Sequence, residues 1–432
     1  MSPAVVGLVL GLALPGEGAR ATEVPSASAE RMERRIQALA QFGANPQGGV
    51  SRVAYSEADI AGREYVKGLM REAGLRVRVD AAGNVLGRRE GREPGLPAIL
   101  CGSHIDSVPG GGNYDGDVGV IGAIEVAQLL HENGIETRHP LEVVSFTDEE
   151  AGLIGSLAMT GRLQKGALDQ VSHSGKTRRD GIRAVGGDPD HIDRAERKPG
   201  ELRAFIELHI EQGAFLHEAG IPIGVVEGIV GIRRWDVVVE GMANHAGTTP
   251  MKGRRDALLS AAELALAVNR IASTLPGRQV ATVGQIRAEP GAPNVIPGRV
   301  VMSLEIRDLA AENIQAVFDA VAEEARRIAT ARQTPIKFEE FDSVVPAPTH
   351  ERMRKIIAAA AQELGLRHRL MPSGAGHDAQ DMTHIAPTGM IFVPSAFGIS
   401  HSPKEYTSPA DMANGANVLL RTVLAVDRGG LD

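Results

Sequence analysis

The feature that most constrains the fold is an alternation of short apolar runs with longer amphipathic segments. The patterns predict strands at 75–79, 98–101, 141–146, 204–209 and 390–393, and helices at 26–39, 59–73, 120–133 and 351–364. This alternation is typical of α/β layers, in which helices cover a sheet. We therefore expect an α/β fold, in a chain of 432 residues whose 43% hydrophobic and 23% charged content is ordinary for a globular protein.

The pattern changes near Ile229. Strand and helix patterns then follow one another at 235–240, 255–273, 279–287, 299–307 and 311–330. Their β-α-β-β-α-β-like order is typical of a small, largely antiparallel unit. Because the first kind of pattern returns after about Ser343, we predict a discontinuous α/β domain over residues 26–229 and 343–432. An α+β, ferredoxin-like domain over residues 230–342 would interrupt it.

The N-terminal segment, residues 1–25, is read separately. Residues 4–14 are apolar apart from glycines, and Ala19-Arg20-Ala21 follows. This predicts either a signal peptide, and so an exported or periplasmic protein, or a disordered tail on a cytoplasmic one. The run is too short to span a membrane, so we expect no stable membrane association.

Charge and cysteine content exclude several classes of function. The net charge is −8, and the chain has no Lys/Arg run of the kind that binds nucleic acid. Cys101 is the only cysteine, so an internal disulfide and a cysteine-based zinc site are both excluded. The sequence also has no HExxH zinc motif and no GxSxG nucleophile motif.

Charged and imidazole groups gather where predicted strands end. These groups are His104, Asp115, Glu149, Glu150, His209 and His401. In open α/β sheets, ligands bind outside the carboxyl ends of the strands. We therefore expect the loops to converge on one crevice.

Imidazole and carboxylate groups are the ligands that zinc and manganese use in proteins. With about five ligands and one carboxylate able to bridge, two metal ions fit better than one. The adjacent Glu149 and Glu150 suit a division in which one binds metal and the other acts as general base toward a shared water. Each residue alone has an ordinary structural explanation, so the prediction depends on their joint placement.

Eight ordered motifs make the chain recognisable. They are GSHIDSVPGGGNYDG, FTDEEAGLIGS, ELHIEQG, GMANHAGTTPM, PNVIPG, EIRD, GAGHDA and GISHSPKEY. Together they resemble the hydantoinase/carbamoylase amidase family, part of a wider superfamily of di-metal aminoacylases and peptidases. The resemblance covers about Glu30 to Arg428. It implies a di-metal aminopeptidase-like catalytic domain with an inserted lid and dimerisation domain, and hence a homodimer.

The resemblance also implies two divalent metal ions per subunit, Zn²⁺ or Mn²⁺, with Co²⁺ or Ni²⁺ as alternatives. His104 and His209 would bind one ion, Glu150 and His401 the other, and Asp115 would bridge both.

Further roles follow from the same resemblance. Glu149 would be the general base, and Asp106 would hold the imidazole of His104. Arg307 would grip a substrate carboxylate with its guanidinium fork. The residues expected to complete the substrate pocket are Gln212, His245, Asn294 and His377.

The function implied is metal-dependent hydrolysis of the ureido (carbamoyl) C–N bond of a small carboxylic acid. The substrate would be an N-carbamoyl-L-amino acid or allantoate, and the products would include ammonia and CO2. Ureidoglycolate hydrolysis is an alternative. An aminoacylase or dipeptidase is another, although His209 at its position argues against it. A relative that only binds metal or a partner is a third, against which the complete set of matched residues argues.

Overall fold

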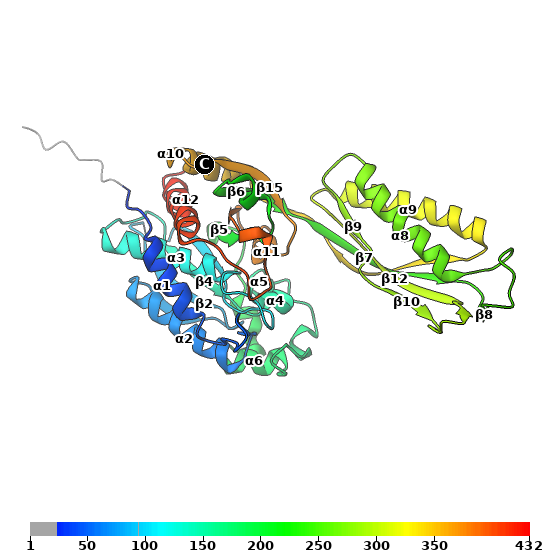
Figure 1. Cartoon of the computed structure of the whole chain (residues 1–432). Helices are drawn as coiled ribbons and strands as arrows, with labels where there is room; N and C mark the ends of the chain where they lie inside the picture. The colour runs from blue at the N-terminus through cyan, green and yellow to red at the C-terminus, as the bar shows by residue number, and fades with distance from the viewer. Residues whose placement is uncertain (1–23, 94) are drawn as a thin grey trace, which may run out of the picture.

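The computed structural model describes residues 24–93 and 95–432 and has a mixed α/β fold (Figure 1). The N-terminal prediction of a signal peptide or tail lies almost wholly outside the described residues. Within the described part of the chain, every helix is too short or too polar to cross a membrane.

The larger sheet has nine strands among the described residues, in the order β1-β2-β4-β3-β5-β16-β6, with β14 and β15 both paired to β6. The neighbours β4, β3, β5 and β16 run parallel, whereas β1, β2 and β14 pair antiparallel with their neighbours. The strands are β1 (Arg76–Val79), β2 (Val85–Arg89), β3 (Ala98–His104), β4 (Leu141–Phe146), β5 (Leu202–Ile210), β6 (Ile223–Ile229), β14 (Ala347–Pro348), β15 (His368–Ser373) and β16 (Thr388–Val393). Strands β3, β4 and β16 are buried along their length, which explains why most of their residues are apolar.

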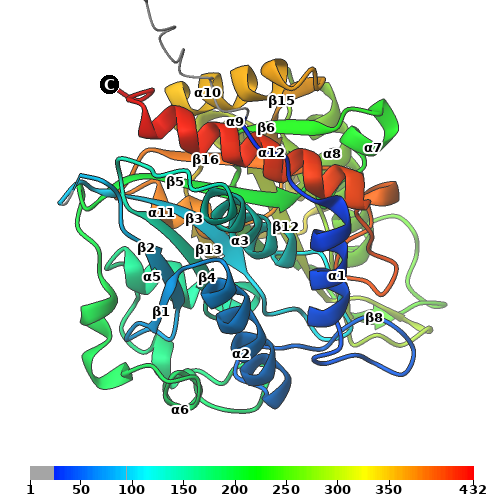
Figure 2. The same cartoon turned by 90° about the vertical axis from the view of Figure 1, so that its left-hand side faces the viewer.

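Helices cover both faces of this sheet. On one face the long helices share a single apolar core with the strands (Figure 2). They are α1 (Ala29–Leu39), α2 (Glu57–Glu72), α3 (Asp117–Glu132), α10 (Glu351–Glu363) and α12 (Pro409–Asp427). Ser28, Ser56 and Ser408 each cap a helix by accepting a hydrogen bond from the main-chain N–H three residues on.

Short helices contribute to the other face and its loops. They are α4 (Glu149–Gly152), α5 (Ile154–Met159), α6 (Arg178–Ala184), α7 (Phe215–Ala219) and α11 (Asp378–Met382). Met159, Leu216 and Met382 from three of them belong to one core cluster with Phe205 and Phe392 of the sheet.

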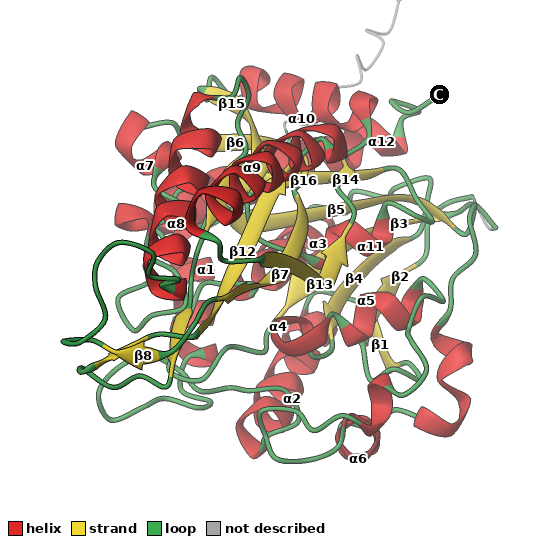
Figure 3. Ribbon diagram, turned by 90° about the vertical axis from the view of Figure 1, so that its right-hand side faces the viewer, coloured by secondary structure: helices red, strands yellow, loops and turns green. Residues whose placement is uncertain are grey.

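A second sheet is built from strands within residues 231–344. Its order is β10-β12-β7-β13, with β9 also paired to β12, and every pairing is antiparallel. Helices α8 and α9 cover one face (Figure 3). The elements are β7 (Gly231–Glu240), α8 (Ala257–Thr274), β9 (Val280–Thr282), β10 (Ile286–Glu289), β12 (Arg299–Asp308), α9 (Ala311–Arg332) and β13 (Ile336–Val344). Separately, β8 (Asn244–His245) and β11 (Val295–Ile296) form a two-stranded ribbon.

The prediction of one continuous strand over residues 279–287 is wrong. The structure has two short strands, β9 and β10, with a break around Gly284. The break has a local cause, because the main-chain N–H groups of Gly284 and Gln285 donate to the Ser303 hydroxyl. A side chain thus accepts hydrogen bonds there.

Candidate metal centre and active site

The candidate site lies at the carboxyl edge of the larger sheet. His104 is the last residue of β3, His209 is the penultimate residue of β5, and Glu149 and Glu150 open α4 just after β4. His401 lies in the loop that follows β16. Because these four strands are parallel neighbours, their carboxyl ends meet at one edge.

Asp115 lies at the centre of the cluster. Its Oδ1 is 3.2 Å from His209 Nε2 and 3.7 Å from His104 Nε2. Its Oδ2 is 3.3 Å from His401 Nε2, which in turn is 3.4 Å from Glu150 Oε2. One carboxylate therefore belongs to two groups of potential metal ligands, and within each group the ligand atoms lie within 4.8 Å of one another.

The hydrogen bonds of two imidazoles orient them for metal binding. His104 Nδ1 lies 3.0 Å from the Asp106 carbonyl oxygen, and His209 Nδ1 lies 2.9 Å from the Ile210 carbonyl oxygen. Since each Nδ1–H donates to a carbonyl, each imidazole in its neutral form has the lone pair of Nε2 on the side of Asp115. Lone pairs and carboxylate oxygens face one another, so the residues present fit a bound cation of the zinc or manganese type.

Asp106 acts through two different groups. Its main-chain carbonyl, rather than its carboxylate, accepts the hydrogen bond from His104; the carboxylate oxygen is 3.8 Å from that nitrogen. The carboxylate instead accepts from the main-chain N–H groups of Glu149, at 3.3 Å, and Glu150, at 3.2 Å. It therefore fixes the start of α4, where the two predicted functional glutamates lie.

Acidic groups crowd the buried cluster. Burial and the nearby Asp115 carboxylate raise the pKa of Glu150 to about 8. Burial, with the charges of Asp378 and Glu150, holds the pKa of Glu149 well above its ordinary value. Burial also raises the pKa of Glu207 to about 7. Positive charge supplied by a bound metal would stabilise the ionised form of each.

Glu405 was not predicted from the sequence, yet it joins two of the loops. Its Oε1 accepts hydrogen bonds from the main-chain N–H groups of Tyr114, at 2.9 Å, and Asp115, at 3.0 Å. Its Oε2 accepts from the Ser400 hydroxyl, at 2.8 Å, and the His401 N–H, at 3.1 Å. One buried carboxylate thus holds the loop of Asp115 against the loop of His401. The only signal in the sequence was its place in the GISHSPKEY motif.

Backbone strain is also concentrated here. Asp148, Leu153, Gln212 and His401 have φ values of 53–59°, a region that non-glycine residues rarely adopt and that is common at functional sites. Gly116 has φ 67°, and a Cβ there would lie 2.5 Å from the His104 ring. Only glycine fits this position beside the imidazole.

A cavity of about 440 Å³ opens over the cluster. It is lined by Asp115, Glu149, Glu150, Gln212, Arg234, Arg307, His377 and His401, among others. Gln212 Nε2 donates to Asp115 Oδ2 at 2.6 Å. The His377 ring packs edge-on against His209, with centroids 4.4 Å apart, and is tied to the Ser373 hydroxyl at 2.8 Å.

Two arginines of the second sheet reach this cavity. Arg307 donates to Glu305 Oε1 and to the Gly374 carbonyl oxygen, both at 2.7 Å. Arg234, which sequence reasoning missed, donates to the other oxygen of Glu305 at 2.6 Å and also pairs with Asp342. The predicted clamp residue is therefore at the cavity but already has partners.

The structure does not bring His245 and Asn294 to the cavity of their own chain, so their role in substrate binding stays a prediction. Both are exposed, and they lie at the β8–β11 ribbon, at the far end of the second sheet in Figure 1. The antiparallel pairing of this ribbon and the hydrogen bond from Ala246 N–H to the Asn294 carbonyl oxygen, at 2.9 Å, hold them there.

The chain is similar to several known hydrolases. Residues 100–425 match the family model "Peptidase family M20/M25/M40". The chain is 42% identical over 405 residues to the N-carbamoyl-L-amino acid amidohydrolase of Geobacillus stearothermophilus, covering 93% of this chain and 99% of the relative. It is 40% identical over 413 residues to the ureidoglycolate hydrolase of Arabidopsis thaliana, covering 92% and 86%.

A solved structure leads to the same family. The crystal structure of a hydantoinase/carbamoylase family amidase from Burkholderia ambifaria superposes with a TM-score of 0.87 at 35% identity, covering 94% of this chain and 98% of that one. The chain belongs to the hydantoinase/carbamoylase amidase family, within peptidase family M20/M25/M40.

Membership makes this amidase a metal-dependent hydrolase of amide C–N bonds, and its two ligand groups around Asp115 are candidate metal sites. The family resemblance predicted from the eight motifs is confirmed.

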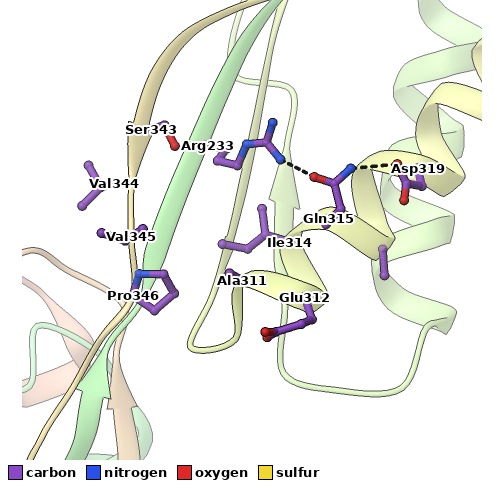
Figure 4. Close-up of a pocket in the computed structure, with 11 residues that line it drawn as sticks. Arg233, Ala311, Glu312, Ile314, Gln315, Asp319, Ser343, Val344, Val345 and Pro346 are labelled. Carbon is purple, nitrogen blue, oxygen red and sulfur yellow. Dashed lines mark hydrogen bonds between the residues drawn. The ribbon is translucent and has the colours of Figure 1, made fainter.

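A separate hollow of about 520 Å³ in the amidase lies between the end of β13 and the start of α9 (Figure 4). There Arg233 donates to the Gln315 side-chain oxygen at 2.6 Å, and the Gln315 amide donates to Asp319 at 2.8 Å. These polar groups satisfy one another, and no histidine is among the lining residues. We therefore place the candidate active site at the Asp115 cluster and not in this hollow.

Proposed function

We propose that the protein hydrolyses the ureido C–N bond of an N-carbamoyl-L-amino acid or of a related small ureido acid such as allantoate, releasing ammonia and CO2. The observation that carries the proposal is the position of Asp115, shared by two groups of imidazole and carboxylate ligands beneath the cavity that Arg307 also lines. Relatives whose names specify carbamoyl and ureido substrates support it.

In this proposal His104 and His209 would hold one divalent ion, zinc or manganese, and Glu150 and His401 would hold another, while Asp115 belongs to both ligand groups. When bound, such a pair lowers the pKa of a shared water and polarises the carbonyl of a substrate.

Glu149 is the residue we assign as general base. It lines the cavity, and its Oε2 is 3.7 Å from His104 Nε2, so its carboxylate lies next to one of the two ligand groups. It would take a proton from the attacking water and pass it to the leaving nitrogen. Asp106 would keep Glu149 in place through the main-chain hydrogen bond at the start of α4.

Arg307 is the residue we assign to the substrate carboxylate. Its Nε and Nη1 are engaged by Glu305 and Gly374, which leaves donors of the guanidinium group for a ligand in the cavity. Gln212 and His377 line the same space and would position the ureido group.

We further propose that residues 26–229 and 343–432 form the catalytic domain and that residues 230–342 form a lid and dimerisation domain. In a homodimer, the exposed His245 and Asn294 of one subunit would be available to the site of the other.

Ureidoglycolate is a second candidate substrate, favoured by the similarity to the ureidoglycolate hydrolase of Arabidopsis thaliana. It differs from an N-carbamoyl amino acid in carrying a hydroxyl where the amino acid has a side chain.

The test is a substrate panel with ammonia detection. Protein stripped by chelation and reloaded separately with zinc, manganese, cobalt or nickel is given N-carbamoyl-L-amino acids, allantoate, ureidoglycolate and N-acetyl-L-amino acids. We expect metal-dependent ammonia release from at least one ureido acid. Hydrolysis of the N-acetyl compounds alone, without ammonia, would identify an aminoacylase and contradict the proposal.

A further inference from the structure

A second cavity adjoins the candidate active site and shares Arg307 with it. Its volume is about 660 Å³. Arg307 and Val280 come from the second sheet, whereas Phe215 on α7, and Arg369 and Met371 on β15, come from the larger unit. The cavity is therefore lined by both units, and it shares with the candidate active site the guanidinium group proposed to hold the substrate.

The charged side chains that line this cavity are all cationic. They are Arg278, Arg307 and Arg369, and no carboxylate is among the lining residues. Arg278 pairs with Glu227 at 2.7 Å and Arg307 pairs with Glu305 at 2.7 Å, so the positive charge of each arginine is partly neutralised by its carboxylate partner.

Arg369 differs from the other two. No carboxylate of residues 24–93 or 95–432 lies within salt-bridge distance of it, and its guanidinium carbon lies 5.8 Å from the centre of the Phe215 ring. Its donors are exposed and remain open to an anion.

The remaining walls of the cavity are apolar and unusually open to water. Phe215 is 63% exposed and Val280 is 56% exposed, whereas Met371 and Val230, which also line the cavity, are buried. A ligand that covered these side chains would gain from burying apolar surface. The cavity thus combines apolar walls with a cation that forms no salt bridge among the described residues, although its charge acts on the Glu211 carboxylate. This combination suits a short alkyl chain ending in an anion.

We propose that this cavity is the side-chain subsite of the enzyme and that it selects N-carbamoyl-L-amino acids with an acidic side chain, such as N-carbamoyl-L-glutamate. The inference rests on the proposed function, because it takes Arg307 as the group that holds the α-carboxylate between the two cavities. With that carboxylate at Arg307 and the ureido group over Asp115, the side chain enters the second cavity and its terminal carboxylate meets Arg369.

The experiment compares three substrates on the metal-loaded, full-length protein: N-carbamoyl-L-glutamate, its neutral isostere N-carbamoyl-L-glutamine, and N-carbamoylglycine, which has no side chain. We expect kcat/KM for the glutamate derivative to exceed that for the glutamine derivative by at least about tenfold, the scale of a charge-assisted hydrogen bond at a partly exposed site. Raising the salt concentration should reduce this ratio.

Variants of Arg369 test whether the cavity makes the selection. In Arg369→Gln the glutamate-to-glutamine ratio should fall to about one, mainly through a higher KM for the glutamate derivative. Arg369→Lys keeps the charge and should retain part of the ratio. The matched control is Arg367→Gln: Arg367 is also exposed, lies just before β15, donates only to the Gly220 carbonyl oxygen and is not among the lining residues. It should keep the full ratio.

The outcomes separate the two proposals. Ammonia release from N-carbamoylglycine with no preference for the glutamate derivative would overturn the subsite and leave the proposed function standing. If the preference for the glutamate derivative remained in Arg369→Gln, the proposed subsite would also be wrong, because a group other than Arg369 would then bind the side-chain carboxylate. No ammonia from any of the three would contradict the N-carbamoyl amino acid assignment, and the subsite would fall with it.

Discussion

The two sheets of the molecule differ in how deeply their charged side chains are buried. At the edge of the larger sheet, His104 and Asp115 are 1% and 8% exposed and lie among carboxylates whose pKa values are raised by burial. On the second sheet, Arg233 and Glu340 pair at 2.6 Å, and both side chains are partly exposed. An excess of buried carboxylates lowers the stability of a fold, and it is retained where the chemistry of a site requires it. An exposed ion pair contributes little to stability or to that chemistry.

The largest expected effect comes from neutralising the shared carboxylate. Asp115→Asn keeps the shape of the side chain but removes the charge common to both ligand groups. We expect loss of bound metal and a fall in kcat/KM of at least about 10³-fold, since several kcal/mol of stabilisation depend on the metal pair. Metal analysis of the purified variant checks this, and Asp236→Asn, an exposed change on the second sheet, is the control. Full retention of both ions would show that the ligand assignment is wrong.

The next effect concerns the residue beside the ligands. Glu149→Gln keeps the volume and removes the base, so kcat should fall by at least about 10²-fold while KM and metal content stay close to those of the unchanged protein. Steady-state kinetics on the best substrate of the panel, together with metal analysis, measures all three quantities. Normal kcat would assign the proton transfer to another group.

Buried acid should also appear as a pH dependence of stability, away from the metal ligands. Asp59 accepts a hydrogen bond from Tyr55 N–H at 2.7 Å, and burial raises its pKa to about 6. Because this pKa is above that of the unfolded chain, the folded state holds the proton more tightly. This residue therefore lowers the free energy of unfolding as the pH rises from about 4 to about 6.

The variant Asp59→Asn removes this pH-dependent contribution to the free energy of unfolding. Relative to the unchanged protein, it should gain about 2 kcal/mol of unfolding free energy between pH 4 and pH 7. Urea unfolding of both proteins at the two pH values measures the difference. A difference that does not change with pH would mean that Asp59 titrates as it does in the unfolded chain.

A smaller effect is expected at the cavity wall. Arg307→Lys keeps the charge and loses the fork, so KM should rise by about tenfold for carboxylate substrates, with a smaller fall in kcat. Arg287→Lys, on the exposed edge strand β10, serves as control. If KM stays normal for every carboxylate substrate, Arg307 has only the structural role that its hydrogen bonds to Glu305 and Gly374 describe.

The smallest effect should come from the surface pair. Glu340→Gln removes the partner of Arg233 but leaves that guanidinium over the Trp235 ring, 4.7 Å from its centre. The free energy of unfolding should change by less than about 1 kcal/mol, and kcat/KM should not change. A larger loss of stability would mean that the partly exposed ion pairs of the second sheet contribute more to the free energy of unfolding than we expect.

Local patterns in the sequence were sufficient for much of the fold. The strand at 141–146 is found with the predicted bounds, because a buried strand of a parallel sheet is mostly apolar. The helices at 311–330 and 351–364 begin at the predicted residue, and they end within two residues of prediction. Strands β6 and β15 were not predicted, since the first contains two glycines and the second is largely polar.

The candidate site, like the fold, could be predicted from the sequence only in part. His104, Asp115, Glu150, His209 and His401 were predicted from their places after strands and from the family motifs, and the structure brings them together; their roles as ligands stay predictions. Hydrogen bonds that involve main-chain groups could not be predicted from the sequence. The hydrogen bond from Asp115 N–H to Glu405 joins residues 290 positions apart, and no local pattern signals it. The lid and dimer also stay predictions.

The position of β16 in the larger sheet has a consequence for how the protein is made. This strand lies between β5 and β6, although it is synthesised after every other strand. A nascent chain that has left the ribosome as far as β15 therefore has a sheet with one interior strand missing, and the loops of Asp115 and His401 have not yet met. Since chains begin to fold from the N-terminus during synthesis, the metal centre is among the last parts to form. Premature termination near the end of translation should leave a protein that lacks metal as well as a finished core.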